Sequence, residues 1–177
     1  MRPLGTDYLQ YDSEIYPFRT IIEDYIGEEL ERIHYKRHYE LLNQLKTEQR
    51  TIFHKRVYRE VTDGDRLNFL ELYKSFLKDY IQPQWGDTQL CYQTIPTFRF
   101  QFPGNIGVSK FHRDSSYNHS PNEKNYFLPL MDTKETTSIW VESNVDKGDY
   151  APMICKYGEV IQWDGSTLTH GNKLNTT

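Results

Sequence analysis

Long apolar runs are missing from this sequence of 177 residues. No stretch approaches the roughly 18 consecutive apolar residues that a membrane-spanning helix needs. Carboxylates also interrupt the first sixteen residues, MRPLGTDYLQYDSEIY, where a secretory signal would carry a continuous apolar segment. We therefore expect a cytoplasmic protein with no membrane partner.

Charge runs of one sign and clusters of cysteine are also absent. The 21 Lys and Arg residues are interspersed with 25 Asp and Glu residues and leave a net charge of -4, so nothing predicts binding to nucleic acid. Cys91 and Cys155 stand far apart and match no zinc or redox spacing, which favours two free thiols in a reducing compartment. The partner class that remains is a small-molecule substrate, and the oligomeric state does not follow from the sequence.

The chain is long enough for one sizeable core and too short for two ordinary domains, so we expect a single domain over residues 1–177. Within its first part, residues 1–82, apolar side chains recur at helical spacing. Helices are therefore predicted over Phe18–His38, Tyr39–Leu45 and Arg66–Ile81. Asp63 or Asp65 can cap the last of these helices, and Pro83 ends it.

Residues 90–177 carry strand signals instead. The segment Thr97–Phe102 alternates, with three phenylalanines on one face and Arg99 and Gln101 on the other. Further short strands, bounded by Gly, Pro, Asp and Asn turn signals, are predicted over Asn125–Leu130, Ser138–Glu142, Pro152–Lys156, Glu159–Trp163 and Leu168–Gly171. Many short strands in a row favour a barrel or sandwich, so the predicted fold is mainly β with N-terminal helices packed outside.

An imidazole and a carboxylate stand two residues apart at His112 and Asp114. Because successive side chains of a strand alternate between faces, these two point the same way and can share one metal ion. His170, on the last predicted strand, supplies a third ligand if antiparallel pairing brings it opposite. Two histidines and one carboxylate on one face of an octahedral ion leave three positions open, as ferrous iron needs to hold a co-substrate and dioxygen.

Other histidines have plainer interpretations. His34 and His38 are four residues apart on a predicted helix, but they lack the neighbouring glutamate of a metalloprotease motif and are interpreted as a solvated face. His119 lies in the turn-rich loop that follows Asp114, where it either touches substrate at the mouth of a cavity or is an ordinary loop residue.

Two runs of sequence carry a family resemblance, FHRDSSYNHSPNEKNYFLPLMDTKETTSIWVES and YGEVIQWDGSTLTHGNKLNTT. They resemble the streptomycin-biosynthesis-associated branch of the Fe(II)- and 2-oxoglutarate-dependent dioxygenase superfamily, from Gln93 onward and more weakly around His54–Tyr58. The resemblance implies that His112, Asp114 and His170 bind Fe(II). It implies the fold of that superfamily, a double-stranded β-helix or cupin-like jelly roll. It also implies a reaction that consumes dioxygen, decarboxylates 2-oxoglutarate to succinate and hydroxylates a small polar metabolite.

One part of the superfamily's site is missing from the sequence. Its members usually hold the distal carboxylate of 2-oxoglutarate with a basic residue beyond the second histidine. Since the sequence ends at Thr177, we expect it to lack the last strand of the jelly roll, with Arg99 as the alternative carboxylate-binding residue. Gln101 and Asn125 are predicted to join Arg99 in binding the co-substrate, and His119 and Trp140 to bind the substrate. Arg99 and Gln101 could instead face water.

Two other functions are compatible with the same residues. A catalytically inactive jelly-roll protein could use the cavity to hold a metabolite or a metal ion. A cupin-type isomerase or hydrolase would need a metal but no co-substrate, although such sites usually carry three or more nitrogen ligands. The primary prediction is a hydroxylase-type oxygenase that uses Fe(II), 2-oxoglutarate and dioxygen.

Overall fold

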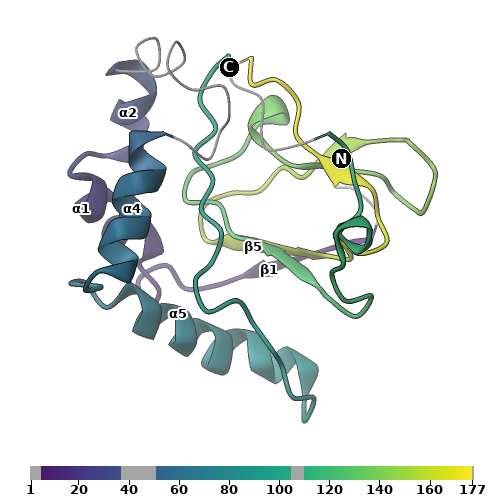
Figure 1. Cartoon of the computed structure of the whole chain (residues 1–177), viewed down its shortest axis with the longest axis horizontal. Coiled ribbons are helices and arrows are strands. Elements are labelled where there is room, and N and C mark those ends of the chain that lie inside the picture. The colour runs from purple at the N-terminus through teal and green to yellow at the C-terminus, as the bar shows by residue number, and fades with distance from the viewer. Residues whose placement is uncertain (1–4, 37–50, 105–109, 177) are drawn as a thin grey trace.

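Helices occupy one side of the molecule and short strands the other (Figure 1). The computed structural model describes residues 5–36, 51–104 and 110–176. The α-helices in these ranges are α1 (Phe18–Ile26), α2 (Leu30–Lys36), α4 (Ile52–Thr62) and α5 (Phe69–Phe76). The last of them continues as a π-helical turn over Leu77–Ile81 and a 3-10 turn over Gln82–Trp85. None of the helices in the described ranges has the length and apolar character needed to span a bilayer.

The ends of these helices follow from local chemistry. The helix predicted over Phe18–His38 is divided because Gly27 adopts a left-handed conformation, with φ 75°, and its amide donates to the carbonyl of Glu23. The helix predicted from Arg66 begins at Phe69 instead, and its N-cap residue is Asn68, not Asp63 or Asp65. The Asp65 carboxylate still accepts the first amides of the helix, from Phe69 at 2.7 Å and Leu70 at 2.8 Å. The helix predicted over Tyr39–Leu45 lies outside the described residues.

The strands form two antiparallel sheets of three strands each. One sheet has the order β1-β5-β2 and the other β4-β3-β6. Their bounds are β1 Thr6–Gln10, β2 Asn125–Phe127, β3 Trp140–Val141, β4 Ala151–Pro152, β5 Glu159–Trp163 and β6 His170–Gly171. The sequence predicted β5 with the observed bounds, whereas β1, in the part expected to be helical, was missed. β1 pairs with all of β5, from Thr6 opposite Trp163 to Gln10 opposite Glu159.

The central strand β5 separates two hydrophobic cores. Val160 belongs to the larger core, which the helices and the phenylalanines of residues 98–102 fill with aromatic rings. Ile161 and Trp163 belong to the smaller core, with Val141 and Met153 from the region of the second sheet. The second core also contains Cys155, and both cysteines are free thiols, as predicted.

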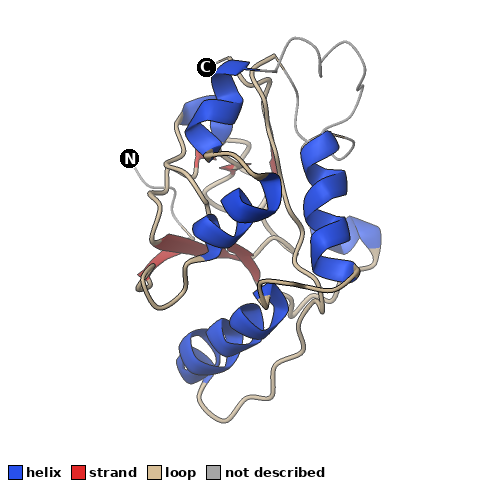
Figure 2. Ribbon diagram, turned by 90° about the vertical axis from the view of Figure 1, so that its left-hand side faces the viewer, coloured by secondary structure: helices blue, strands red, loops and turns tan. Residues whose placement is uncertain are grey.

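The prediction of a mainly β jelly roll is wrong. The strands of the described residues are two to five residues long and stand in two separate small sheets, while helices and loops make up most of the fold (Figure 2). Residues 90–177 therefore hold short paired segments and long loops instead of a jelly-roll core.

The segment Thr97–Phe102 shows why the prediction failed. The alternation was real, because Phe98 packs against Phe69 of α5, and Phe100 and Phe102 pack against Phe53 of α4, at ring distances of 5.4 to 5.9 Å. The segment nevertheless forms no strand among the described residues. Its backbone is satisfied by side chains: the amides of Phe98 and Phe100 donate to the Tyr58 hydroxyl and to His54 Nε2, and the carbonyl of Gln101 accepts from Asn175. Alternation of apolar residues predicts which face of a segment is buried. A β-strand also requires an adjacent strand whose backbone pairs with its amides and carbonyls.

Candidate metal centre

The structure brings His112, Asp114 and His170 together. Each offers one ligand atom, and these atoms all lie within 4.8 Å of one another. His170 stands in β6, and His112 pairs with it in an antiparallel bridge, in which each backbone amide donates to the other residue's carbonyl at 2.9 Å. The predicted antiparallel pairing is therefore confirmed. Asp114 begins a 3-10 turn over Asp114–Tyr117, so it reaches the cluster from a turn that follows the bridge and not from a strand.

Backbone carbonyls orient both imidazole rings. His112 Nδ1 lies 3.0 Å from the carbonyl oxygen of Lys110, and His170 Nδ1 lies 3.0 Å from that of Leu168. A carbonyl oxygen only accepts, so Nδ1 carries a proton in each ring, and the neutral form of each ring therefore has its lone pair on Nε2. The Nε2 atoms lie 3.4 Å (His112) and 3.6 Å (His170) from Asp114 Oδ1. Burial lowers the pKa of His170, which favours the neutral form that binds metals.

The Asp114 carboxylate has different surroundings at its two oxygens. Oδ1 faces the imidazoles, and Oδ2 accepts a hydrogen bond from Asn125 Nδ2 at 2.8 Å. The backbone amide of Asp114 donates to the carbonyl of Gly165 at 2.9 Å. Two imidazole nitrogens with a lone pair and one oriented carboxylate oxygen form a donor set that fits a divalent transition-metal ion such as Fe(II).

A buried glutamate that was not predicted, Glu142, lies next to both histidine segments: it contacts the neighbour of each histidine in the sequence, Thr169 and Arg113. Glu142 is 1% exposed; its Oε1 accepts the Thr169 amide at 2.7 Å, and its Oε2 accepts the Gly148 amide at 3.2 Å. Burial alone would raise the pKa of Glu142, but these hydrogen bonds hold it below its ordinary value. Arg113, which stands between the ligands His112 and Asp114, donates to Thr169 Oγ1 at 3.2 Å and lies 3.7 Å from Glu142. No sequence signal distinguished Glu142 from an ordinary strand residue.

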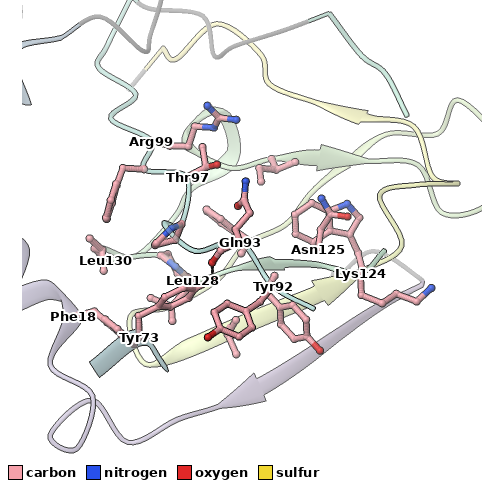
Figure 3. A pocket seen from close by; sticks show the side chains of 18 of the residues that line it. Phe18, Tyr73, Tyr92, Gln93, Thr97, Arg99, Lys124, Asn125, Leu128 and Leu130 are labelled. Atoms are coloured by element: carbon pink, nitrogen blue, oxygen red, sulfur yellow. Dashed lines mark hydrogen bonds between the residues drawn. The ribbon is translucent and has the colours of Figure 1, made fainter. Parts of the chain in front are cut away.

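The three residues lie on the wall of a cavity of about 2960 Å³. Figure 3 shows side chains that line it, among them Tyr73, Tyr92, Arg99, Lys124 and Asn125. This volume exceeds that of an ordinary ligand pocket, because the cavity is a large cleft that extends from the helices near Phe18 and Tyr73 to the ligand residues.

The predicted co-substrate residues all line this cavity but differ in their contacts. Arg99 is exposed, and its charge helps to lower the pKa of the buried His54. Gln101 Nε2 donates to the carbonyl oxygens of Lys173 at 3.0 Å and Thr136 at 3.3 Å, which commits this amide to holding the C-terminal segment. Asn125 contacts Asp114 directly.

Of the two predicted substrate residues, His119 lines the cavity and Trp140 does not. His119 is exposed, lines the cavity, and places Nδ1 3.0 Å from the carboxylate of Glu123. Trp140 is not among the described residues that line the cavity; it donates from Nε1 to the carbonyl of Glu135 at 3.1 Å, and the Lys173 ammonium lies 3.3 Å from the centre of its ring.

Two aromatic residues beside the cluster were not predicted. Tyr117 is 62% exposed and lies edge-on to the His112 ring at 5.3 Å, and Trp163 lies edge-on to the His170 ring at 5.7 Å. Both line the cavity. The position of Tyr117, three residues after Asp114 in the same loop, was the available signal. Of the other histidine pair, His34 lies in α2 and His38 falls outside the described residues.

Comparison with known proteins gives one informative relative. No family model and no solved structure matches this sequence. The sequence is 31% identical over 170 residues to the streptomycin biosynthesis protein StrG of Streptomyces griseus, in a match that covers 96% of this chain and 77% of that protein. The streptomycin-biosynthesis part of the resemblance is thus confirmed, and membership of the dioxygenase superfamily stays a prediction. The chain belongs to the family of the streptomycin biosynthesis protein StrG.

Proposed function

We propose that this protein is a non-heme iron oxygenase that uses 2-oxoglutarate and dioxygen to hydroxylate a small polar metabolite. The observation that carries the proposal is the cluster of His112, Asp114 and His170 on the wall of a large cavity. A structural zinc site closes its coordination with four protein ligands. In the described residues, no fourth histidine, cysteine, aspartate or glutamate joins this group. Three ligands leave room for a chelating co-substrate and dioxygen.

Each residue near the metal site would have a distinct role. When bound, the iron supplies the redox chemistry with dioxygen. His112 and His170 contribute neutral nitrogen ligands whose rings are held by backbone carbonyls, so little reorientation is needed on metal binding. Asp114 contributes a negative charge that partly neutralises the ion. Tyr117 lies edge-on to the His112 ring at 5.3 Å and would pack beside that ligand.

A cationic side chain for the distal carboxylate of 2-oxoglutarate is available on the cavity wall. Arg99 presents its guanidinium there (Figure 3), and a planar guanidinium can bind a carboxylate through two parallel hydrogen bonds. Lys124, also on the wall, already pairs with Asp164 at 2.6 Å. The wall carries further cations, among them Lys78 and Lys134, but we assign the carboxylate-binding role to Arg99 because a guanidinium can bind a carboxylate at two points. The name of the StrG relative, a biosynthesis protein, supports an enzyme that acts on a small molecule.

The test is succinate formation from 2-oxoglutarate with Fe(II) and ascorbate under air. We expect turnover without added substrate in the unmodified protein and none in Asp114→Ala. We expect Arg99→Ala to raise the KM for 2-oxoglutarate at least about tenfold, the effect of losing a charge-assisted hydrogen bond, while Fe(II) still binds. Asp87→Ala, which removes an exposed aspartate, is the matched control. An unmodified protein that binds iron but forms no succinate would be a metal-binding protein without this activity, and the proposal would be wrong.

A further inference from the structure

Asn125 holds one oxygen of the Asp114 carboxylate. It stands at the start of β2, opposite Trp163 in the β5 register. Its Nδ2 donates to Asp114 Oδ2 at 2.8 Å, while Asp114 Oδ1 faces both Nε2 atoms at 3.4 and 3.6 Å. The carboxylate therefore presents one oxygen to the two imidazoles and has the other occupied.

The Asn125 amide is fixed in one orientation. An ionised carboxylate only accepts hydrogen bonds, so the amide nitrogen and not the amide oxygen must face Asp114. This orientation leaves Asn125 Oδ1 buried with no hydrogen-bond partner in the described part of the chain. A buried acceptor without a partner costs free energy. The side chain thus gives up one hydrogen bond to make the contact with Asp114.

Gly165 makes room for this contact. A Cβ atom on Gly165 would lie 2.4 Å from Asn125 Oδ1 and 2.7 Å from Asp114 Oδ2. Both distances are shorter than any normal contact of a Cβ atom, so a side chain at position 165 would force Asn125 or Asp114 to move. The glycine is thus required by space at the point where Asn125 and Asp114 meet.

We propose that Asn125, seated against Gly165, is a positioning residue that makes Asp114 coordinate the metal through Oδ1 alone. This inference rests on the proposed function. An octahedral ion with two histidines and a one-oxygen carboxylate keeps three positions, enough for a co-substrate that chelates through two atoms and for dioxygen. A carboxylate bound through both oxygens would take one of those positions. Asn125 therefore keeps the third position available.

The experiment uses Co(II), a spectroscopic stand-in for Fe(II) that needs no turnover. Asn125→Leu removes the hydrogen-bond donor at similar volume, and Asn125→Ala removes it without the risk of overpacking. We expect Co(II) affinity to fall about 10- to 100-fold in both variants, as for other residues that orient a metal ligand. We also expect the visible absorption of bound Co(II) to change and 2-oxoglutarate to bind the Co(II) form more weakly. Asn144→Leu, in an exposed loop, is the matched control and should behave as the unmodified protein.

The outcomes separate this inference from the proposed function. If the unmodified protein binds Co(II) and both Asn125 variants keep its affinity and spectrum, the positioning role is wrong and the proposed function stands. If the Asn125 variants only lower the melting temperature of the metal-free protein, with an unchanged Co(II) spectrum, the role is structural and the inference is again wrong. If the unmodified protein binds neither Co(II) nor Fe(II), both proposals fall.

Discussion

The helical side of the molecule and the side that carries the metal ligands are held together by different interactions. On the helical side, most aromatic rings pack edge to face or tilted, as Phe76 does edge-on against Phe18 at 5.4 Å and Tyr11 at 5.5 Å. On the ligand side, the buried residues include several polar ones, among them Glu142, Ser166 and Asn175, which are 1% exposed. The hydrophobic effect that drives apolar packing has no preferred direction, whereas hydrogen bonds are directional. The side that must hold three ligand atoms in place uses the directional interactions.

Both sides depend on contacts between residues far apart in the sequence. On the helical side, the Tyr25 hydroxyl donates to Asp65 at 2.7 Å. On the ligand side, Arg113 donates to Thr169 at 3.2 Å. These contacts involve different residues, so loss of the ligand geometry should be separable from loss of helical packing.

The largest expected effect comes from one substitution on each side. Phe53→Ala opens a cavity among Phe100 and Phe102 and should lower the free energy of unfolding by about 3 to 5 kcal/mol. Glu142→Ala leaves the amides of Thr169 and Gly148 without their buried acceptor and should cost about 2 to 4 kcal/mol. Urea unfolding of the metal-free proteins measures both losses.

Metal affinity should separate these two variants. Glu142→Ala should weaken Fe(II) binding as well, because the neighbours of Glu142 are next to the ligands in the sequence: Thr169 precedes His170, and Arg113 follows His112. Phe53→Ala should leave the Fe(II) affinity of the folded protein unchanged. Glu142→Gln, which keeps an acceptor at one atom, should fall between the unmodified protein and Glu142→Ala. Equal metal affinities in Phe53→Ala and Glu142→Ala would contradict the division into two sides.

Acid should weaken the helical side through His54. This side chain is 1% exposed, and burial, with help from the Arg99 charge, lowers its pKa from 6.5 to about 4. Between these values the unfolded chain binds a proton that the folded protein does not, so stability must fall as pH falls. We expect a loss of about 2 to 3 kcal/mol between pH 7 and pH 4.5, measured by urea unfolding with a chelator present. His54→Gln should show a correspondingly flatter pH dependence, and an equally steep one would show that His54 is not the cause.

The parts of this molecule that the sequence predicted correctly have short-range causes. The spacing of His112 and Asp114 predicted that they share a site, although Asp114 reaches it from a turn and not from a strand. The strand signal around His170 predicted the pairing that brings it opposite His112. The bounds of β5 followed from its local pattern in the same way.

The parts that could not be predicted depend on distant partners. Arg99 and Gln101 were placed on a strand, but the backbone of their segment is bound by side chains of α4 and of Asn175. Local alternation contains no information about those partners. β1 was missed because its strand character comes from pairing with β5, about 150 residues later, rather than from its own composition. Trp140 was expected to line the cavity, but it does not do so among the described residues. Strand alternation predicts which residues share a face of a strand, and it does not predict which face borders the cavity.

The smallest expected effect tests whether the helical side needs its buried polar groups at all. The Tyr11 hydroxyl is buried with no hydrogen-bond partner in the described residues, and burial raises its pKa. Tyr11→Phe should leave the free energy of unfolding unchanged or raise it by up to about 1 kcal/mol, because an unsatisfied group is removed and the ring packing against Phe76 is kept. Tyr25→Phe is the matched control: it removes a hydroxyl that donates to Asp65 at 2.7 Å and should cost about 1 kcal/mol in the same urea measurement. A loss in Tyr11→Phe as large as in Tyr25→Phe would mean that the Tyr11 hydroxyl is bonded in solution, and that the helical side also depends on directional contacts.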